Sequence, residues 1–155
     1  MRRVLGILQF CIITTFGQPM THHASGTFEV KVSPQKPDSD PAKNANLARM
    51  SIDKRFHGDL EATSAGEMLS ATTEVKGSAG YVAMERVNGV LQGRHGSFVL
   101  QHHGIMSRGA PQLTVTIVPD SGTGELTGIS GSMSIKIEGG KHSYELEYSL
   151  PPVSP

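Results

Sequence analysis

The sequence predicts an all-β protein that forms one eight-stranded antiparallel β-barrel. Short runs in which apolar and polar residues alternate recur along the chain, and turns rich in glycine and proline separate them. No predicted helix is longer than one turn. Closing the sheet removes the exposed edges that an open sheet of this length would present, so we favour a barrel over a two-sheet sandwich. With 155 residues, of which 37% are hydrophobic, the chain has enough material for one core.

The first 19 residues are set apart from this domain. Two arginines precede a mostly apolar run over 4–16, which has the outline of a secretory signal. Gln9 interrupts that run, however, and Met20 stands directly before the first folded residues. We divide the chain into a signal-like leader or mis-assigned start over 1–19 and a single β-barrel domain over 20–155. We favour a start at Met20, which predicts a cytoplasmic protein; a working signal would predict a secreted or periplasmic one.

The first half of the domain is predicted to begin with three strands. Apolar residues alternate with polar ones over Thr27–Ser33, Leu47–Leu60 and Glu67–Val75. A loop with three prolines, Pro34–Asn46, joins the first two strands. A turn at Thr63–Gly66 is expected to join the second to the third.

The stretch from Gly80 to His102 carries the strongest hairpin pattern in the chain. Asn88-Gly89 stands between two alternating runs, which is typical of a type I′ turn. With this turn, Glu85 and Arg94 lie on a diagonal that long side chains can span. Neither face is wholly polar, and either could point inward. One face collects Tyr81, Ala83, Glu85, Gln92, Arg94, Phe98, Leu100 and His102.

The C-terminal part predicts one further strand and a final hairpin. A loop over His103–Gln112 leads to a strand over Leu113–Val118, and a turn over Pro119–Gly124 leads to a strand over Leu126–Ile137. Gly139-Gly140 forms the turn of the final hairpin. The apolar face of that hairpin holds Ile129, Met133, Ile135, Ile137, His142, Tyr144, Leu146, Tyr148 and Leu150, with Ile135 opposite Tyr144 and Met133 opposite Leu146.

Composition excludes several classes of partner. Lys+Arg and Asp+Glu both number 14, and the chain has no tryptophan, so nucleic acid and membrane surfaces are not expected as partners. The seven histidines include no H-x-H pair, so no metal site is predicted. The one cysteine, Cys11, lies in the leader, which leaves the domain without thiol chemistry. No cofactor is expected.

Long stretches of the chain resemble a known family. The strongest are GSAGYVAMERVNGVLQGRHGSFVLQHHG over 77–104 and VPDSGTGELTGISGSMSIKIEGGKHSYELEYSLP over 118–151. With ASGTFEVKVSPQ over 24–35 and DKRFHGDLEATSAGEML over 53–69, they make the chain similar to the bacterial domain of unknown function 3224 family. The resemblance implies a fold like the allene oxide cyclase barrel, with eight antiparallel strands around a central cavity. It implies no established activity, and no catalytic motif of the plant cyclases aligns here residue by residue.

The candidate site combines side chains from the two hairpins. The face of the first hairpin places a carboxylate, a guanidinium and an imidazole together, and the last hairpin adds an imidazole and two phenols. Such a set would suit a small apolar or amphipathic ligand that bears a carboxylate or carbonyl. The alternative is a buried ion pair with satisfied hydroxyls in a packed barrel. The candidate residues are Tyr81, Glu85, Arg94, His102, His142, Tyr144 and Tyr148.

Three functions follow from this candidate set. The first is a non-enzymatic binder of a small apolar or amphipathic molecule in the barrel. The second is a cofactor-free isomerase or cyclase in which Glu85, His102 or Tyr81 moves a proton or stabilises charge. The third is a structural assembly module with a packed barrel, whose outer half-apolar face is buried between subunits. A homo-oligomer is expected.

Overall fold

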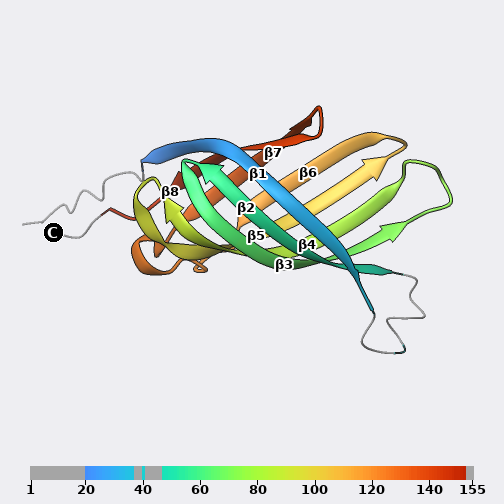
Figure 1. Cartoon of the computed structure of the whole chain (residues 1–155), viewed down its shortest axis with the longest axis horizontal. Helices are drawn as coiled ribbons and strands as arrows, with labels where there is room; N and C mark the ends of the chain where they lie inside the picture. The colour runs from blue at the N-terminus through green and yellow to red at the C-terminus, as the bar shows by residue number, and fades with distance from the viewer. Residues whose placement is uncertain (1–19, 37–39, 41–46, 153–155) are drawn as a thin grey trace, which may run out of the picture.

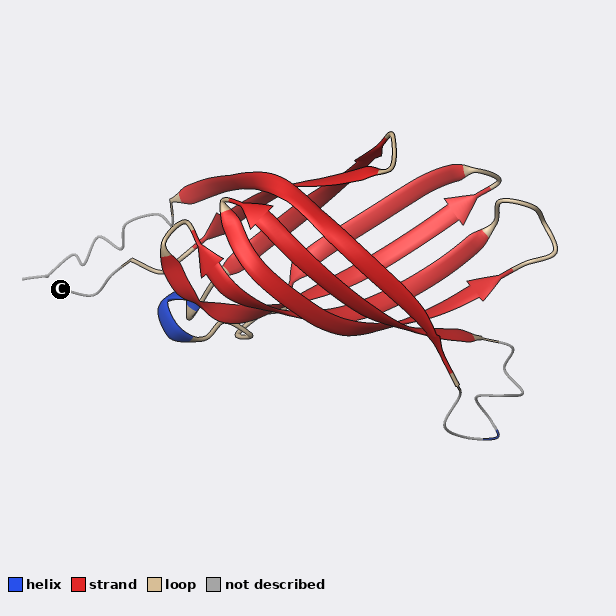
Figure 2. Ribbon diagram, viewed as in Figure 1, coloured by secondary structure: helices blue, strands red, loops and turns tan. Residues whose placement is uncertain are grey.

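The computed structural model describes residues 20–36, 40 and 47–152, and these form the predicted closed antiparallel barrel (Figure 1). Neighbours in sequence pair with one another, and β1 also pairs with β8. A short 3₁₀ turn, η1 (Gly124–Leu126), precedes β7 (Figure 2). The strands are β1 (Thr21–Gln35), β2 (Ala48–Gly58), β3 (Leu60–Thr72), β4 (Ala79–Leu91), β5 (Arg94–Ser107), β6 (Ala110–Ile117), β7 (Ser130–Glu138) and β8 (Lys141–Ser149).

Some predictions fall on residues that the structure does not describe. The assignment of 1–19 and most of the predicted loop over 34–46 lie outside the described ranges. Within those ranges, no helix is long and apolar enough to cross a membrane.

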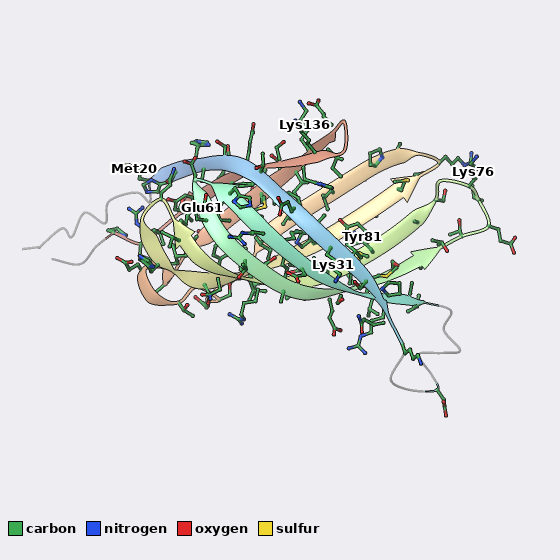
Figure 3. All side chains as sticks on the ribbon, in the orientation of Figure 1. Met20, Lys31, Glu61, Lys76, Tyr81 and Lys136 are labelled. Atoms are coloured by element: carbon green, nitrogen blue, oxygen red, sulfur yellow. The ribbon has the colours of Figure 1, made fainter. Side chains whose placement is uncertain are left out.

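One half of the barrel is a packed core. This core half carries the β2–β3 turn, the β4–β5 turn and η1, and it lies toward Met20 in Figure 3. Inward-facing side chains there are almost fully buried, so this half has the interior of an ordinary small barrel. They include Phe56, Leu60, Val87, Leu91, Phe98, Leu126, Ile129, Leu146 and Tyr148, each at most 1% exposed.

The other half of the barrel, toward Lys76 in Figure 3, is open. β6 and β7 form one residue pair, Thr116 with Ser132, at the end of these strands nearest η1, and they spread apart in the open half (Figure 1). β8 pairs with β1 only as far as Phe28. Apolar residues on the inward side of the sheet are therefore left in contact with solvent, with Val32 47%, Met106 42% and Leu113 41% exposed.

The predicted turn at Asn88-Gly89 is wrong. β4 runs through both residues, and the chain turns four residues later, at Gln92-Gly93, with φ of 46° and 83°. Gly89 is needed for close packing of strands, because a Cβ there would lie 2.3 Å from the carbonyl oxygen of Glu61. The Asn-Gly pair therefore marks a tight contact between β3 and β4.

The predicted faces of this hairpin survive the error. Moving a turn by four residues shifts each opposed pair by an even number, so alternate residues keep their side of the sheet. Glu85 now lies opposite Leu100 instead of Gln92, but Glu85, Leu100 and His102 still share a face. All three are buried, which shows that this face points inward.

Two further turn predictions are wrong. β2 and β3 join at Gly58-Asp59, where Gly58 has φ of 107°, and Thr63–Gly66 lies inside β3. Glycine is required at position 66, because a Cβ there would lie 2.2 Å from the carbonyl oxygen of Met84. The predicted loop over His103–Gln112 is in fact the end of β5 and the start of β6, joined by a two-residue turn.

The last hairpin is confirmed. It turns at Gly139-Gly140, both with positive φ, and Ile135 pairs with Tyr144 as predicted. The strand predicted to begin at Leu126 starts later, at Ser130, because η1 occupies the preceding residues. Because both turn residues are glycines in left-handed conformation, the turn fixes the register between β7 and β8, and the sequence was enough to predict it.

The corrected turn predicts that two substitutions in β4 and its turn destabilise the fold, for different reasons. Gly89→Ala should lower the free energy of unfolding by about 2 kcal/mol or more, because the new methyl group overlaps the β3 backbone. Gln92→Asn should lower it by about 1 kcal/mol, because the shorter amide no longer reaches the Tyr148 hydroxyl and the His23 carbonyl oxygen, and this outweighs the better tolerance of asparagine for positive φ. Urea denaturation of the two variants and the wild type measures both. Equal stability of Gly89→Ala and wild type would contradict the close contact at Glu61.

Candidate functional site

Four successive strands each contribute one polar side chain to the centre of the barrel. These are Lys54 of β2, Ser64 of β3, Glu85 of β4 and His102 of β5, which we call the polar cluster. Lys54 lies directly opposite Ser64 in the β2–β3 pair. Glu85 is the diagonal neighbour of Ser64 across β3 and β4, and His102 is the diagonal neighbour of Glu85 across β4 and β5. Their exposed fractions are 6%, 5%, 0% and 3%, respectively. The cluster lies where the core half meets the open half.

Glu85 is the hub of the polar cluster. Its Oε2 accepts hydrogen bonds from Lys54 Nζ at 2.7 Å and from His102 Nε2 at 2.9 Å. Its Oε1 accepts a hydrogen bond from the Ser64 hydroxyl. Lys54 Nζ also lies 4.9 Å from the centroid of the Phe28 ring, within the range of a cation–π contact. Every member of the cluster thus contacts the same carboxylate.

Glu85 is ionised at neutral pH. Burial raises the pKa of its carboxyl, but the hydrogen bond from His102 and the charge and hydrogen bond of Lys54 outweigh burial and lower the pKa to about 2. An ionised carboxylate can only accept hydrogen bonds, so His102 donates the proton on Nε2.

Tyr81 is the predicted residue that extends the site into the open half. It pairs with Gly104, and its ring lies where a side chain at Gly104 would stand: a Cβ there would be 2.0 Å from the ring. Burial and the charge of Glu85 raise the pKa of the Tyr81 phenol. Tyr81, Glu85 and His102 therefore lie on the same inward face of β4 and β5.

Arg94 does not join this group. It pairs with Leu91 beside the β4–β5 turn, while Glu85 pairs with Leu100. Six residues of strand separate the two positions, or about 20 Å at the usual rise per residue. The predicted diagonal between Glu85 and Arg94 is wrong, because it depended on the misplaced turn, and Lys54 is the cation that Glu85 binds.

The remaining predicted residues lie elsewhere along β8. Tyr148 is in the core half, where its hydroxyl donates to Gln92 Oε1 at 2.8 Å. The Tyr144 hydroxyl accepts from the Leu60 backbone N–H at 2.9 Å. The His142 ring contacts the Phe28 ring, with centroids 5.1 Å apart. These side chains are held by structural contacts and do not touch the polar cluster.

Sequence reasoning missed Lys54 and Ser64. Lys54 stands between Ile52 and Phe56 on the apolar parity of its strand, and a charged residue in that position indicates a buried partner. That pattern was available in the sequence. Ser64 was hidden because the misplaced turn removed it from any strand face.

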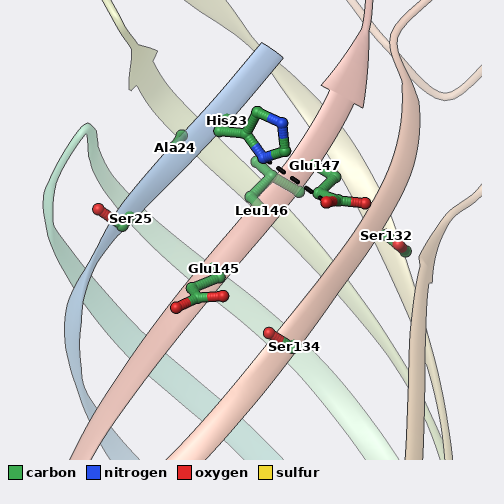
Figure 4. A pocket seen from close by; sticks show the side chains of 8 residues that line it. All are labelled: His23, Ala24, Ser25, Ser132, Ser134, Glu145, Leu146 and Glu147. Atoms are coloured by element: carbon green, nitrogen blue, oxygen red, sulfur yellow. Dashed lines mark ion pairs between the residues drawn. The ribbon is translucent and has the colours of Figure 1, made fainter. Parts of the chain in front are cut away.

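Among the hollows in the described barrel wall, two border both β1 and β8. One, of about 560 Å³, opens where β1 leaves β8, and its lining includes Phe28, Val30 and His142. One of its lining residues, Phe28, has its ring centroid 4.9 Å from Lys54 Nζ of the polar cluster. The other, of about 410 Å³, lies on the outer face over β1, β7 and β8 (Figure 4). It holds an exposed ion pair of His23 and Glu147 at 3.6 Å and has no link to the cluster.

The acidic and imidazole groups offer little to a metal ion. Within the described ranges, His, Cys, Asp and Glu side chains do not gather in groups of three that could hold one. In the polar cluster, the ammonium group of Lys54 already takes the place beside Glu85 that a cation would need.

The fold and the site together define a small closed β-barrel with an ionised cluster at its centre and one open half. The chain belongs to the DUF3224 family, described as proteins of unknown function, whose model matches residues 24–148. This confirms the resemblance noted in the sequence. The chain is similar to a protein of unknown function from this family in Shewanella oneidensis MR-1, known from a crystal structure. The two share 51% identity and a TM-score of 0.79 over 86% of this chain and 100% of that one. No curated protein matches the sequence.

The hub position of Glu85 predicts strong coupling with Lys54. Glu85→Gln should lower the free energy of unfolding by about 3–5 kcal/mol, because it leaves the Lys54 ammonium buried without a countercharge. The double variant Lys54→Met/Glu85→Gln should recover most of this loss. The exposed pair Lys136 and Glu138 is a matched control, for which the equivalent changes should cost less than about 1 kcal/mol. Urea denaturation measures all of these, and a near-neutral Glu85→Gln would contradict the assignment.

The lowered pKa of Glu85 predicts loss of stability in acid. Its folded pKa of about 2 lies below the ordinary value of 4.5, so the ionised group stabilises the fold fully above pH 4.5. That contribution, about 3 kcal/mol, should disappear as the pH falls from about 4.5 to about 2. We expect the stability curve of the wild type to fall toward that of Glu85→Gln across this range, because protonation of Glu85 also leaves the Lys54 ammonium without a countercharge. Parallel curves would contradict the lowered pKa.

Proposed function

We propose that this protein binds a small amphipathic molecule in the open half of its barrel. The polar end of the ligand contacts the polar cluster, and its apolar part lies against the inward side chains beyond the cluster. The observation that carries this proposal is the position of the cluster. Packed side chains cover it on the side of the core half, and partly exposed apolar residues follow it on the other side.

The inward surface of the open half suits an apolar chain or ring. Met50, Met68 and Met106 come from three strands and face the same side as the cluster, each partly exposed. Methionine is flexible and polarizable, so it adapts to varied apolar shapes. Apolar inward side chains that contact solvent are costly unless something covers them, and a ligand would cover them.

The polar cluster suits an oxygen-bearing group on the ligand. The Lys54 ammonium has three N–H donors, of which Glu85 takes one. A carbonyl or carboxylate oxygen could accept another. The hollow between β1 and β8 is a candidate route, because Phe28 lines it and the Phe28 ring contacts Lys54. Nucleic acid and membrane surfaces are not needed as partners in this proposal.

An assembly role has its own candidate surface. Apolar side chains gather on the outer wall of β3, β4 and β5, where Leu69, Val82 and Met84 are 48–50% exposed and Ile105 is 43% exposed. Val82 pairs with Leu69, so part of this set is continuous across the strands. The predicted homo-oligomer would use this outer wall and would leave the open half free.

Binding of a fluorescent fatty acid, dansylaminoundecanoic acid, tests the proposed site. Met68→Trp should weaken binding at least tenfold, because a larger side chain fills the open half. Leu69→Trp is the matched control, since Leu69 is the adjacent residue on the outer wall, and it should bind the probe as the wild type does. Fluorescence titration gives the dissociation constants. Equal effects of both substitutions, or no binding by the wild type, would count against the site.

A further inference from the structure

The polar cluster leaves one nitrogen of His102 without a partner. Nε2 donates to Glu85, so in the neutral ring Nδ1 carries a lone pair. Nδ1 makes no hydrogen bond with any residue that the structure describes, although His102 is only 3% exposed. The described chain has no fully buried side-chain nitrogen or oxygen that lacks a partner. Nδ1 therefore retains access to solvent, and the inward position of the ring directs that access into the barrel.

Tyr81 supplies a second polar atom of this kind. Its hydroxyl forms no hydrogen bond within the described part of the chain. Tyr81 pairs with Gly104 and His102 pairs with Ala83, so the two side chains lie on one diagonal of β4 and β5 and share the inward face. Diagonal neighbours in a sheet are about 7–8 Å apart at their Cα atoms, a spacing at which one small ligand group can contact both side chains. His102 Nδ1 can accept a hydrogen bond, and the Tyr81 hydroxyl can donate one.

We propose that His102 Nδ1 is a general base that moves a proton within a carbonyl-bearing ligand, while the Tyr81 hydroxyl holds the carbonyl oxygen. The inference deepens the proposed function, because it names the chemistry of a ligand bound at the same site. Glu85 is a positioning residue in this scheme: it fixes the tautomer of His102 and its negative charge stabilises the imidazolium that forms.

The reaction class is the shift of a double bond in a β,γ-unsaturated ketone. Nδ1 takes a proton from the carbon next to the carbonyl group, and the C–H electron pair forms a new C=C bond to the carbonyl carbon. The displaced C=O pair stays on oxygen as an enolate that accepts the hydrogen bond of Tyr81. The imidazolium then returns its proton to the γ-carbon, the enolate C=O re-forms, and the double bond ends in conjugation. Composition is unchanged, so the step needs no oxidant, reductant or cofactor.

Two probes test this reaction on the full-length protein. β-Tetralone in deuterium oxide reports removal of the α-proton by NMR, and a β,γ-unsaturated cyclohexenone reports the complete shift by ultraviolet absorbance. His102→Gln is the informative variant, because its amide N–H can still donate to Glu85 while the basic ring nitrogen is lost. His103→Gln is the matched control, since His103 is the next residue and faces outward.

We expect His102→Gln to slow both reactions at least about 100-fold and Tyr81→Phe at least about tenfold. His103→Gln should match the wild type. Nitrogen NMR of the wild type should show a protonated Nε2 and an unprotonated Nδ1 in the neutral ring of His102, a signature that a merely structural histidine bonded at both nitrogens would lack.

Several outcomes would overturn the inference. Wild-type rates no higher than those of His102→Gln would do so, as would a proton on Nδ1 in the neutral ring. Fluorescent fatty acid binding is measured on the same samples to separate the two proposals. Binding without proton transfer refutes the base and leaves the ligand site intact, whereas absence of both refutes both.

Discussion

A carboxylate with no exposed surface determines the arrangement of four strands in this barrel. Glu85 has to be ionised and satisfied without water, and its three partners come from β2, β3 and β5. An uncompensated charge in that position would cost several kcal/mol, so a slip of any of these strands by one residue is penalised directly. Apolar packing alone tolerates many registers, because one aliphatic side chain substitutes for another. The polar cluster therefore contributes more to specificity of register than to net stability.

Two tyrosines of β8 perform a related task in the core half. The Tyr144 hydroxyl bonds beside the β2–β3 turn and the Tyr148 hydroxyl bonds to Gln92 in the β4–β5 turn. Each phenol fills the interior with its ring and ties the C-terminal strand to a distant turn with its oxygen. These two hydroxyls close the core half, whereas in the described part of the open half the Tyr81 hydroxyl forms no hydrogen bond of this kind.

The sequence predicted faces better than it predicted turns. Which residues share a face depends only on their alternation along the strand, so the inward-facing residues of β4 and β5 were predicted correctly even though the turn is not at Asn88-Gly89. Glycine serves two purposes in this chain: Gly139-Gly140 relieves a turn, while Gly66 and Gly89 allow backbones to approach closely. The sequence alone does not distinguish a glycine that forms a turn from one that allows two strands to approach closely. Partners across the barrel depend on register, which is why Arg94 was assigned to Glu85 and Lys54 was overlooked, although Lys54 interrupts an apolar face.

The weak pairing between β6 and β7 has a consequence for how the barrel assembles. With one residue pair joining those strands, the β7–β8 hairpin is held mainly through β1, whose partners in β8 lie more than 110 residues away in the chain. Six strands can form a curved sheet from neighbouring segments alone, whereas closure has to wait until the two ends of the domain meet. Loop closure of that length is a late and slow event. We therefore expect the last hairpin to act as a separate cooperative unit and the seam beside it to be the first line along which the folded barrel opens.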